Sequence, residues 1–175
     1  MNKAGGFTLI ETLVVITIIV VITGIVIFNV GLERQNSALL RSAQKLSLDL
    51  RRAQNFALSS KDYKTSGIPC GWGMYFNGAG SASYIVFADM AAAVDCSNRD
   101  FIRAADSSED FEVANFETGI TISSLSNNLS NIVFSPPEPT VNFIPDQTSA
   151  SIVLINKNGA TRTININKTG FISSP

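Results

Sequence analysis

A run of about 21 residues without a charged side chain, residues 12–32, constrains this chain more than any other feature of its sequence. At about 1.5 Å per residue, a helix of this length spans the roughly 30 Å hydrocarbon core of a membrane. Lipid offers no partner for backbone polar groups, so a single spanning segment has to be helical. We therefore predict a membrane-spanning helix near the N-terminus.

A cleaved secretory signal is the alternative interpretation of this run. Such signals have an apolar core of about 7–15 residues followed by a small-x-small cleavage site. Here the core is longer, and Phe28-Asn29-Val30 is not such a site. The pattern therefore favours a retained helix.

Charge divides the chain into three segments. Residues 1–32 are neutral, residues 33–64 carry a net charge of +4, and residues 65–175 carry −5. The whole chain has a net charge of −1, which does not indicate a nucleic-acid binder. This distribution predicts a membrane segment, a mildly basic connector and an acidic head.

The chain contains no histidine and only two cysteines. Catalytic triads and general bases that depend on histidine are therefore excluded, as are histidine-containing zinc sites. No other catalytic constellation is apparent. We expect no enzymatic activity, no cofactor and no metal site.

Glu11 lies one position before the charge-free run. A carboxylate at the centre of a membrane costs about 2.5–3.5 kcal/mol, and less near the interface. Spacing alone leaves two alternatives open: Glu11 has a partner within the membrane, or it lies among the lipid headgroups.

Residues 3–13, Lys-Ala-Gly-Gly-Phe-Thr-Leu-Ile-Glu-Thr-Leu, resemble the processing site of type IV pilins and type II secretion pseudopilins. The resemblance implies that residues 1–6 are a leader and that prepilin peptidase cleaves between Gly6 and Phe7. It also implies N-methylation of Phe7. Glu11 would act in filament assembly by neutralising the amine of a neighbouring subunit.

The same resemblance implies a location and a set of partners. The protein would span the bacterial inner membrane once, with its leader in the cytoplasm and its head in the periplasm or outside, and would later enter a filament. Its partners would be prepilin peptidase, other pilin or pseudopilin subunits, the inner-membrane assembly platform and membrane lipid. Many major pilins have a proline in the apolar helix, but residues 7–32 contain none, so local melting is not expected here.

Residues 33–64 are expected to continue the helix of residues 7–32. Apolar positions recur at spacings of four and three residues, and Gly67 and Pro69 end the pattern. The stripe predicts a helix that lies against the head's own sheet; a coiled-coil seam is the alternative. The stripe, with one polar gap at Asn36, consists of Leu32, Asn36, Leu39, Ala43, Leu46, Leu50, Ala53 and Ala57.

Residues 65–175 are expected to form an antiparallel β-sheet head, because short β-branched and aromatic runs alternate with turn signals. The clearest hairpin has strands at 151–155 and 161–166 around Asn158-Gly159, a favoured type I′ pair. The predicted fold class is α+β, with a long N-terminal helix packed on this head. The remaining strands are expected near 73–76, 83–88, 111–115, 120–124, 131–135, 140–144 and 170–172.

This strand pattern resembles that of the H-type minor pseudopilins and the T-type minor pilins. The implied function is a minor pilin or pseudopilin; a major pilin and a DNA-binding minor pilin for DNA uptake are the alternatives. Weak DNA contacts could come from Lys157, Arg162 and Lys168, which could share one end of the sheet. The acidic head nevertheless argues against nucleic acid as a partner.

Cys70 and Cys96 fall in the expected extracytoplasmic head, where disulfides persist. A disulfide between them is predicted, with two buried free thiols as the alternative. A nearby acidic stretch matches no calcium loop and is expected to be solvated. Its acidic residues are Asp100, Asp106, Glu109, Asp110 and Glu112.

Overall fold

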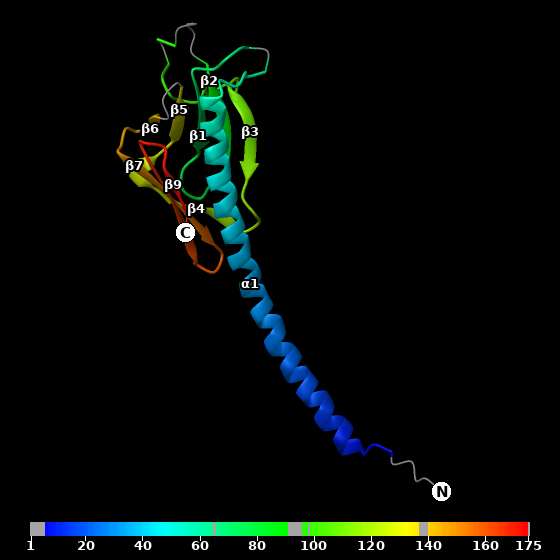
Figure 1. Cartoon of the computed structure of the whole chain (residues 1–175). Helices are drawn as coiled ribbons and strands as arrows, with labels where there is room; N and C mark the ends of the chain where they lie inside the picture. Colours follow the sequence, from blue (N-terminus) through cyan, green and yellow to red (C-terminus); the bar gives the residue numbers. More distant parts are fainter. Residues whose placement is uncertain (1–5, 65, 91–95, 98, 137–139, 175) are drawn as a thin grey trace.

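The computed structural model describes residues 6–64, 66–90, 96–97, 99–136 and 140–174. Within this part of the chain, one long helix precedes nine strands and a single 3₁₀ turn, which confirms the α+β class (Figure 1). The elements are α1 (Leu9–Leu58), β1 (Gly71–Phe76), β2 (Ser83–Asp89), β3 (Asp110–Asn115), β4 (Ile120–Leu125), η1 (Ser126–Asn128), β5 (Asn131–Ser135), β6 (Thr140–Ile144), β7 (Ser149–Asn156), β8 (Thr161–Asn167) and β9 (Ile172–Ser173).

The two predicted helical segments form one continuous helix, α1. Its first half projects away from the head and its second half lies along the strands (Figure 1). The predicted apolar stripe is buried from Leu39 to Ala57; the side chain of Leu32 lies outside the described set. Asn36, the polar gap, accepts a hydrogen bond from Asn156 of β7 at 3.1 Å. The helix therefore packs on the head's own sheets.

The predicted continuation of the helix to residue 64 is wrong, because α1 ends at Leu58. Ser60 adopts a left-handed conformation with φ 48°. The backbone N–H of Lys61 donates to Phe56 O at 3.0 Å, and that of Ser60 donates to Ala57 O at 3.1 Å. These two bonds form a Schellman motif, which satisfies the last carbonyls of the helix.

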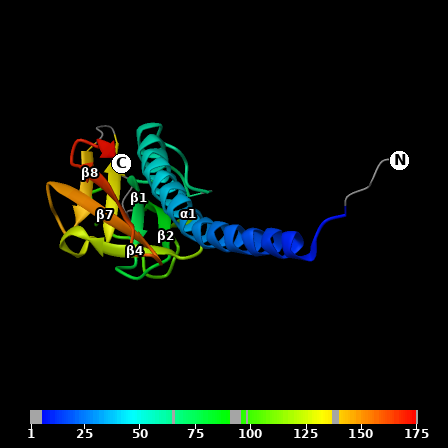
Figure 2. The same ribbon diagram turned by 90° about the horizontal axis from the view of Figure 1, so that it is seen from below.

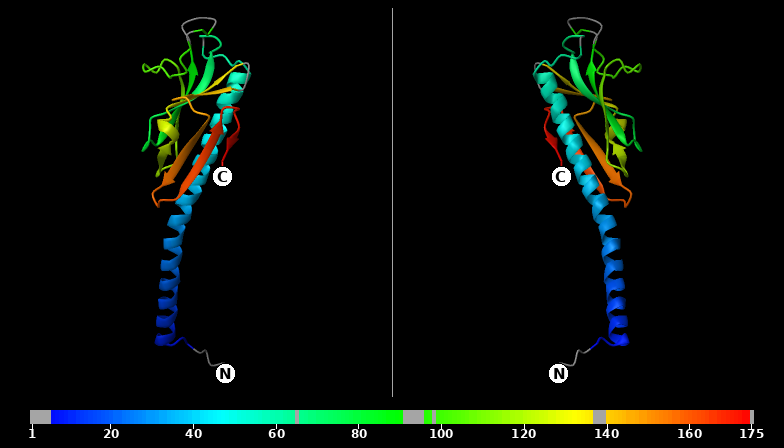
Figure 3. Two further views of the ribbon diagram at one scale, coloured as in Figure 1. Left: turned by 90° about the vertical axis from the view of Figure 1, so that its left-hand side faces the viewer. Right: turned by 90° about the vertical axis from the view of Figure 1, so that its right-hand side faces the viewer.

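The strands form two antiparallel sheets. One has the order β3-β2-β1-β5-β6 and the other the order β4-β7-β8-β9. The second half of α1 contacts β1 and β5 of the first sheet and β4, β7, β8 and β9 of the second. Figures 2 and 3 show both sheets beside this part of the helix. The helix is thus the element that the two sheets share.

The hydrophobic core lies between the helix stripe and the inward faces of the sheets. Trp72, Met74 and Phe76 of β1 are fully buried on one side, and Ile152 and Leu154 of β7 on the other. The alternation of buried and half-buried residues along β7 is that of a sheet with one face on the core. Burial of this stripe and these strands fixes how the head sits on the helix.

The β7–β8 hairpin forms as predicted, but its turn is not type I′. Ile155 pairs with Thr161, and the N–H of Asn156 donates to Ala160 O at 3.0 Å. Gly159 has φ +83°, whereas Asn158 has no positive φ, as type I′ would require. The Asn156 side chain accepts hydrogen bonds from the N–H groups of Asn158 and Ala160, which favours a three-residue loop with glycine in the left-handed position.

Candidate processing and assembly site

Gly6 and Phe7 lie ahead of the helix in non-helical, exposed chain. Residues 1–5 of the expected leader are outside the described residues. A Cβ added at Gly6 would meet nothing within 4 Å, so the chain's own structure does not require glycine there. An exposed, unpaired backbone of this kind is the preferred substrate of a peptidase. Any requirement for a small residue at position 6 would thus arise in the peptidase.

Thr8 caps α1. Its backbone is extended, with φ −80° and ψ 153°, and its Oγ1 accepts a hydrogen bond from the N–H of Glu11 at 3.3 Å. Its carbonyl accepts from the N–H groups of Glu11 and Thr12 at 3.1 and 3.2 Å. The sequence analysis missed this residue, although Thr-x-x-Glu before an apolar run is the signature of a capping box.

Glu11 consequently lies in the first turn of α1, where the partial positive charge of the helix N-terminus favours a carboxylate. Together with Phe7, Thr12, Val15 and Ile16 it lines a shallow hollow of about 300 Å³. Among the described residues Glu11 forms no ion pair. Within the described part of a single copy, the site therefore consists of an acidic group and apolar side chains, without a cation paired to Glu11.

The helix beyond Glu11 has a bare apolar surface. Residues Leu9–Ile27 are long and apolar enough to span a membrane, and none of this stretch is buried against the rest of the protein. Isoleucine, leucine and valine side chains in it are about half exposed or more, on every side of the helix. Such a surface requires lipid or other apolar helices around it.

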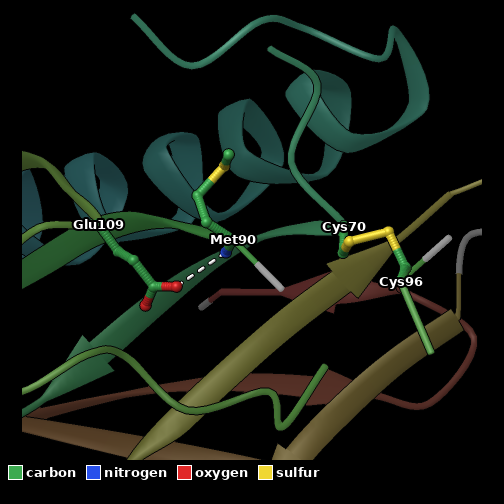
Figure 4. The surroundings of a disulfide bond; sticks show 4 residues. All are labelled: Cys70, Met90, Cys96 and Glu109. Carbon is green, nitrogen blue, oxygen red and sulfur yellow. Dashed lines mark hydrogen bonds between the residues drawn. A yellow bond between two sulfur atoms is a disulfide. The ribbon is translucent and has the colours of Figure 1, made fainter. Parts of the chain in front are cut away.

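The disulfide lies at the far end of the head. Cys70, just before β1, is bonded to Cys96, with the Cα atoms 5.5 Å apart (Figure 4). The described part of the chain contains no free cysteine. The bond ties the region after β2 to the start of the neighbouring strand β1.

The expectation of a fully solvated acidic stretch is wrong for Glu109, which is buried. Its Oε1 accepts a hydrogen bond from the N–H of Met90 at 2.8 Å, and its Oε2 accepts one from Ala104 at 2.7 Å. Asp110 forms an ion pair with Arg103, and Glu112 forms one with Arg52 of α1. These acidic residues therefore form specific hydrogen bonds and ion pairs within the head, although their spacing suggested only a solvated loop. No group of three or more metal-ligating side chains occurs among the described residues.

The three candidate DNA contacts do not share one end of the sheet, which corrects the prediction. Lys157 lies in the β7–β8 turn and Arg162 near the start of β8, whereas Lys168 follows the other end of that strand. Arg162 and Lys168 are six positions apart along an extended chain, which corresponds to about 20 Å. Lys168 also pairs with Asp146 at 2.7 Å.

The N-terminal site matches a known protein-family model. Residues 1–27 match the model of the prokaryotic N-terminal methylation motif. This match supports a type IV pilin-like precursor, and it covers Gly6, Phe7, Glu11 and most of the bare apolar helix. Comparisons with curated proteins and with solved structures gave no match.

Proposed function

We propose that this chain is a minor pilin or pseudopilin, a structural subunit of a type II secretion or type IV pilus filament and not an enzyme. Prepilin peptidase cleaves it between Gly6 and Phe7 and methylates the new amino group of Phe7. One juxtaposition carries the proposal: an exposed, non-helical Gly6–Phe7 bond is followed at once by a capped helix with Glu11 in its first turn and a bare apolar surface. The methylation motif over residues 1–27 supports the same function.

Two charges that would lack a partner within one subunit, the amine of Phe7 and the carboxylate of Glu11, would drive filament assembly. Cleavage creates an amine at Phe7, and Glu11 has no ionic partner among the described residues of its own chain. An unpaired charge in an apolar filament core is costly, whereas a pair between subunits neutralises both groups. Each subunit would therefore bind the next at one axial register.

The head supports an orientation outside the cytoplasm. Disulfides persist in oxidising compartments and are rare in the cytosol. The Cys70–Cys96 bond lies in the head, at the start of β1. We infer that the leader faces the cytoplasm and the head faces the periplasm or the exterior.

Two sheets packed on one helix support a minor subunit of the H-type or T-type. The DNA-uptake alternative is weaker than the sequence suggested, because Lys168 lies apart from Lys157 and Arg162 and is paired with Asp146. Loss of one of three cations leaves little positive charge at either end of β8.

Incorporation of Glu11 variants into filaments tests the proposal. Glu11→Ala and Glu11→Lys should be cleaved normally, because the bond that is cut lies four residues earlier, but neither should enter filaments. Glu33→Ala is the matched control, since Glu33 is an exposed carboxylate on the same helix beyond the apolar run. Normal incorporation of both Glu11 variants would contradict the proposed role.

A further inference from the structure

Two acidic residues at the far end of the head are buried next to one chain segment. Asp89, the last residue of β2, is 2% exposed, and Glu109, just before β3, is 7% exposed. The residues between them include Cys96 of the disulfide and a segment, residues 99–109, that we call the tip segment. The sequence pattern did not single out Asp89 and placed Glu109 in a solvated loop, so neither has a role in the proposed function.

Glu109 holds the two ends of this region together. One carboxylate oxygen accepts the N–H of Met90, directly after β2, at 2.8 Å, as Figure 4 shows. The other oxygen accepts the N–H of Ala104, within the tip segment, at 2.7 Å. A carboxylate that accepts two backbone N–H groups does so best while it is ionised. Glu109 therefore needs its negative charge to keep Ala104 close to β2.

Asp89 contacts the same region but is incompletely satisfied. The backbone of Phe101, also in the tip segment, offers its carboxylate a hydrogen bond. Its Oδ2 is buried and has no hydrogen-bond partner in the described part of the chain. A buried, ionised oxygen without a partner is costly, and a proton on it removes most of this cost.

The charges around Asp89 favour the same proton. Glu109 and Asp100 act on it as negative charges and Arg99 as a positive charge. β2 lies between β1, which contains no charged residue, and β3. The two carboxylates of β3 are each ion-paired, Asp110 with Arg103 and Glu112 with Arg52. Gly71 of β1 pairs with Asp89, and a Cβ at Gly71 would lie 3.8 Å from Asp89 Cβ and 2.6 Å from the side chain of Val133 in β5. β1 offers Asp89 no charge, and Arg99 is opposed by two carboxylates, Glu109 and Asp100, so the charged form of Asp89 is poorly stabilised.

We propose that Asp89 and Glu109 form a proton-dependent latch for the tip segment: a neutral Asp89 keeps the segment on the sheet, and loss of its proton loosens the segment. When both carboxyl groups are ionised, they repel each other in a poorly hydrated place. Local opening relieves the repulsion because water then reaches both groups. The Cys70–Cys96 bond remains intact in either state.

The direction of the pH dependence follows from the carboxyl of Asp89. Burial, with the negative charges of Glu109 and Asp100, raises the pKa of Asp89 to about 6 from its ordinary 3.8. The closed state thus holds the proton more tightly than the open state. The stability that this proton gives the closed state relative to the open state is complete below the ordinary pKa of 3.8. It is lost as the pH rises toward 6 and changes little above that. Between pH 5 and pH 8 opening should become about tenfold more frequent.

Hydrogen–deuterium exchange of the full chain in detergent micelles tests the latch. Exchange times are scaled for the intrinsic effect of pH, and peptides from the tip segment are compared with peptides from β7. We expect protection of the tip segment to fall about tenfold from pH 5 to pH 8, while β7 stays protected. Equal protection at both pH values, or an equal loss in β7, would overturn the proposal.

Two variants separate the latch from a general effect of charge. Asp89→Asn keeps the shape of the side chain without a titrating group, so the tip segment should stay protected at pH 8 as at pH 5. Asp62→Asn, which changes an exposed carboxylate outside the tip segment, should behave as the wild type. Persistence of the pH effect in Asp89→Asn, or its loss in Asp62→Asn, would overturn the proposal. If Asp89→Asn does not fold, the wild-type comparison with β7 still decides.

Discussion

Tyr84 in β2 donates a hydrogen bond of 2.5 Å from its phenolic hydroxyl to the carboxylate of Asp49 on α1. The two residues are 35 positions apart in the sequence, and Tyr84 is buried beside Phe76 and Phe116. This bond joins the helix to β2, an inner strand of the five-stranded sheet. It is one of several hydrogen bonds between α1 and the head, and it leads to two predictions.

Removal of the Tyr84 hydroxyl should weaken the attachment of the head to the helix. Tyr84→Phe leaves Asp49 without this donor, so the free energy of unfolding should fall by about 1–3 kcal/mol. Tyr75→Phe is the matched control, because the Tyr75 hydroxyl is exposed and makes a longer bond of 3.3 Å to Asn77. Chemical denaturation followed by tryptophan fluorescence measures both. Equal stability of the two variants would show that the Tyr84 bond contributes little.

The same hydroxyl predicts a loss of stability at alkaline pH. Burial and the hydrogen bond to Asp49 raise the pKa of Tyr84 above its ordinary value of 10.0. The folded state therefore holds the phenolic proton more tightly than the unfolded state. The contribution of Tyr84 to the free energy of unfolding is complete below pH 10 and is lost as the pH rises above it. The decline should be shallower in Tyr84→Phe than in the wild type. Parallel curves for the two proteins between pH 9 and pH 11 would contradict this prediction.

Two leucines on α1 test how the helix is seated. Leu46 is completely buried, whereas Leu48, two residues later, is 63% exposed. Leu46→Ala leaves a cavity between helix and sheets and should lower the free energy of unfolding by about 2–5 kcal/mol. Leu48→Ala should change it by less than about 0.5 kcal/mol. A larger effect at Leu48 in the isolated subunit would indicate that another face of the helix contacts the head.

The reduced protein should be less stable to unfolding than the disulfide-bonded protein. The closed loop between Cys70 and Cys96, which are 26 positions apart, should stabilise the head by about 3.5 kcal/mol in the chain-entropy model. Cys96→Ser should lower the unfolding free energy by that amount, and reductant should have the same effect on the wild type but none on the variant. Mass spectrometry with and without reductant checks the bond itself; two free thiols in exported protein would exclude it.

Much of this fold could be predicted because the sequence pattern and the packing agree. The helix stripe from Leu39 to Ala57 follows from hydrophobic periodicity. Most strand positions follow from β-branched and aromatic runs between turn signals, although the terminal strand predicted at 170–172 lies at Ile172–Ser173. The end of α1 could not be predicted in this way, because Ser60 takes the left-handed conformation for which glycine is the usual signal. Similarly, the Asn156 side chain selected a hairpin loop that the Asn158-Gly159 pair did not indicate.

The functional residues show the same division. Gly6, Phe7 and Glu11 could be proposed from the sequence because they lie in a linear motif, which the match over residues 1–27 covers. The burial of Asp89 and Glu109 could not, because it depends on contacts between β2 and a segment some ten to twenty residues later. The separation of Lys168 from Arg162 likewise required the length and position of β8. Charges outside motifs acquire their role only from the tertiary structure.

The N-terminal residue of the protein from cells that contain prepilin peptidase tests the account most directly. Tandem mass spectrometry of the purified protein should find N-methylated Phe7 as the first residue in the wild type. Gly6→Leu should retain the leader, because a bulky side chain would clash in the peptidase although the chain itself has room for it. A wild-type protein that begins at Met1, or a Gly6→Leu variant that begins at methylated Phe7, would contradict the account.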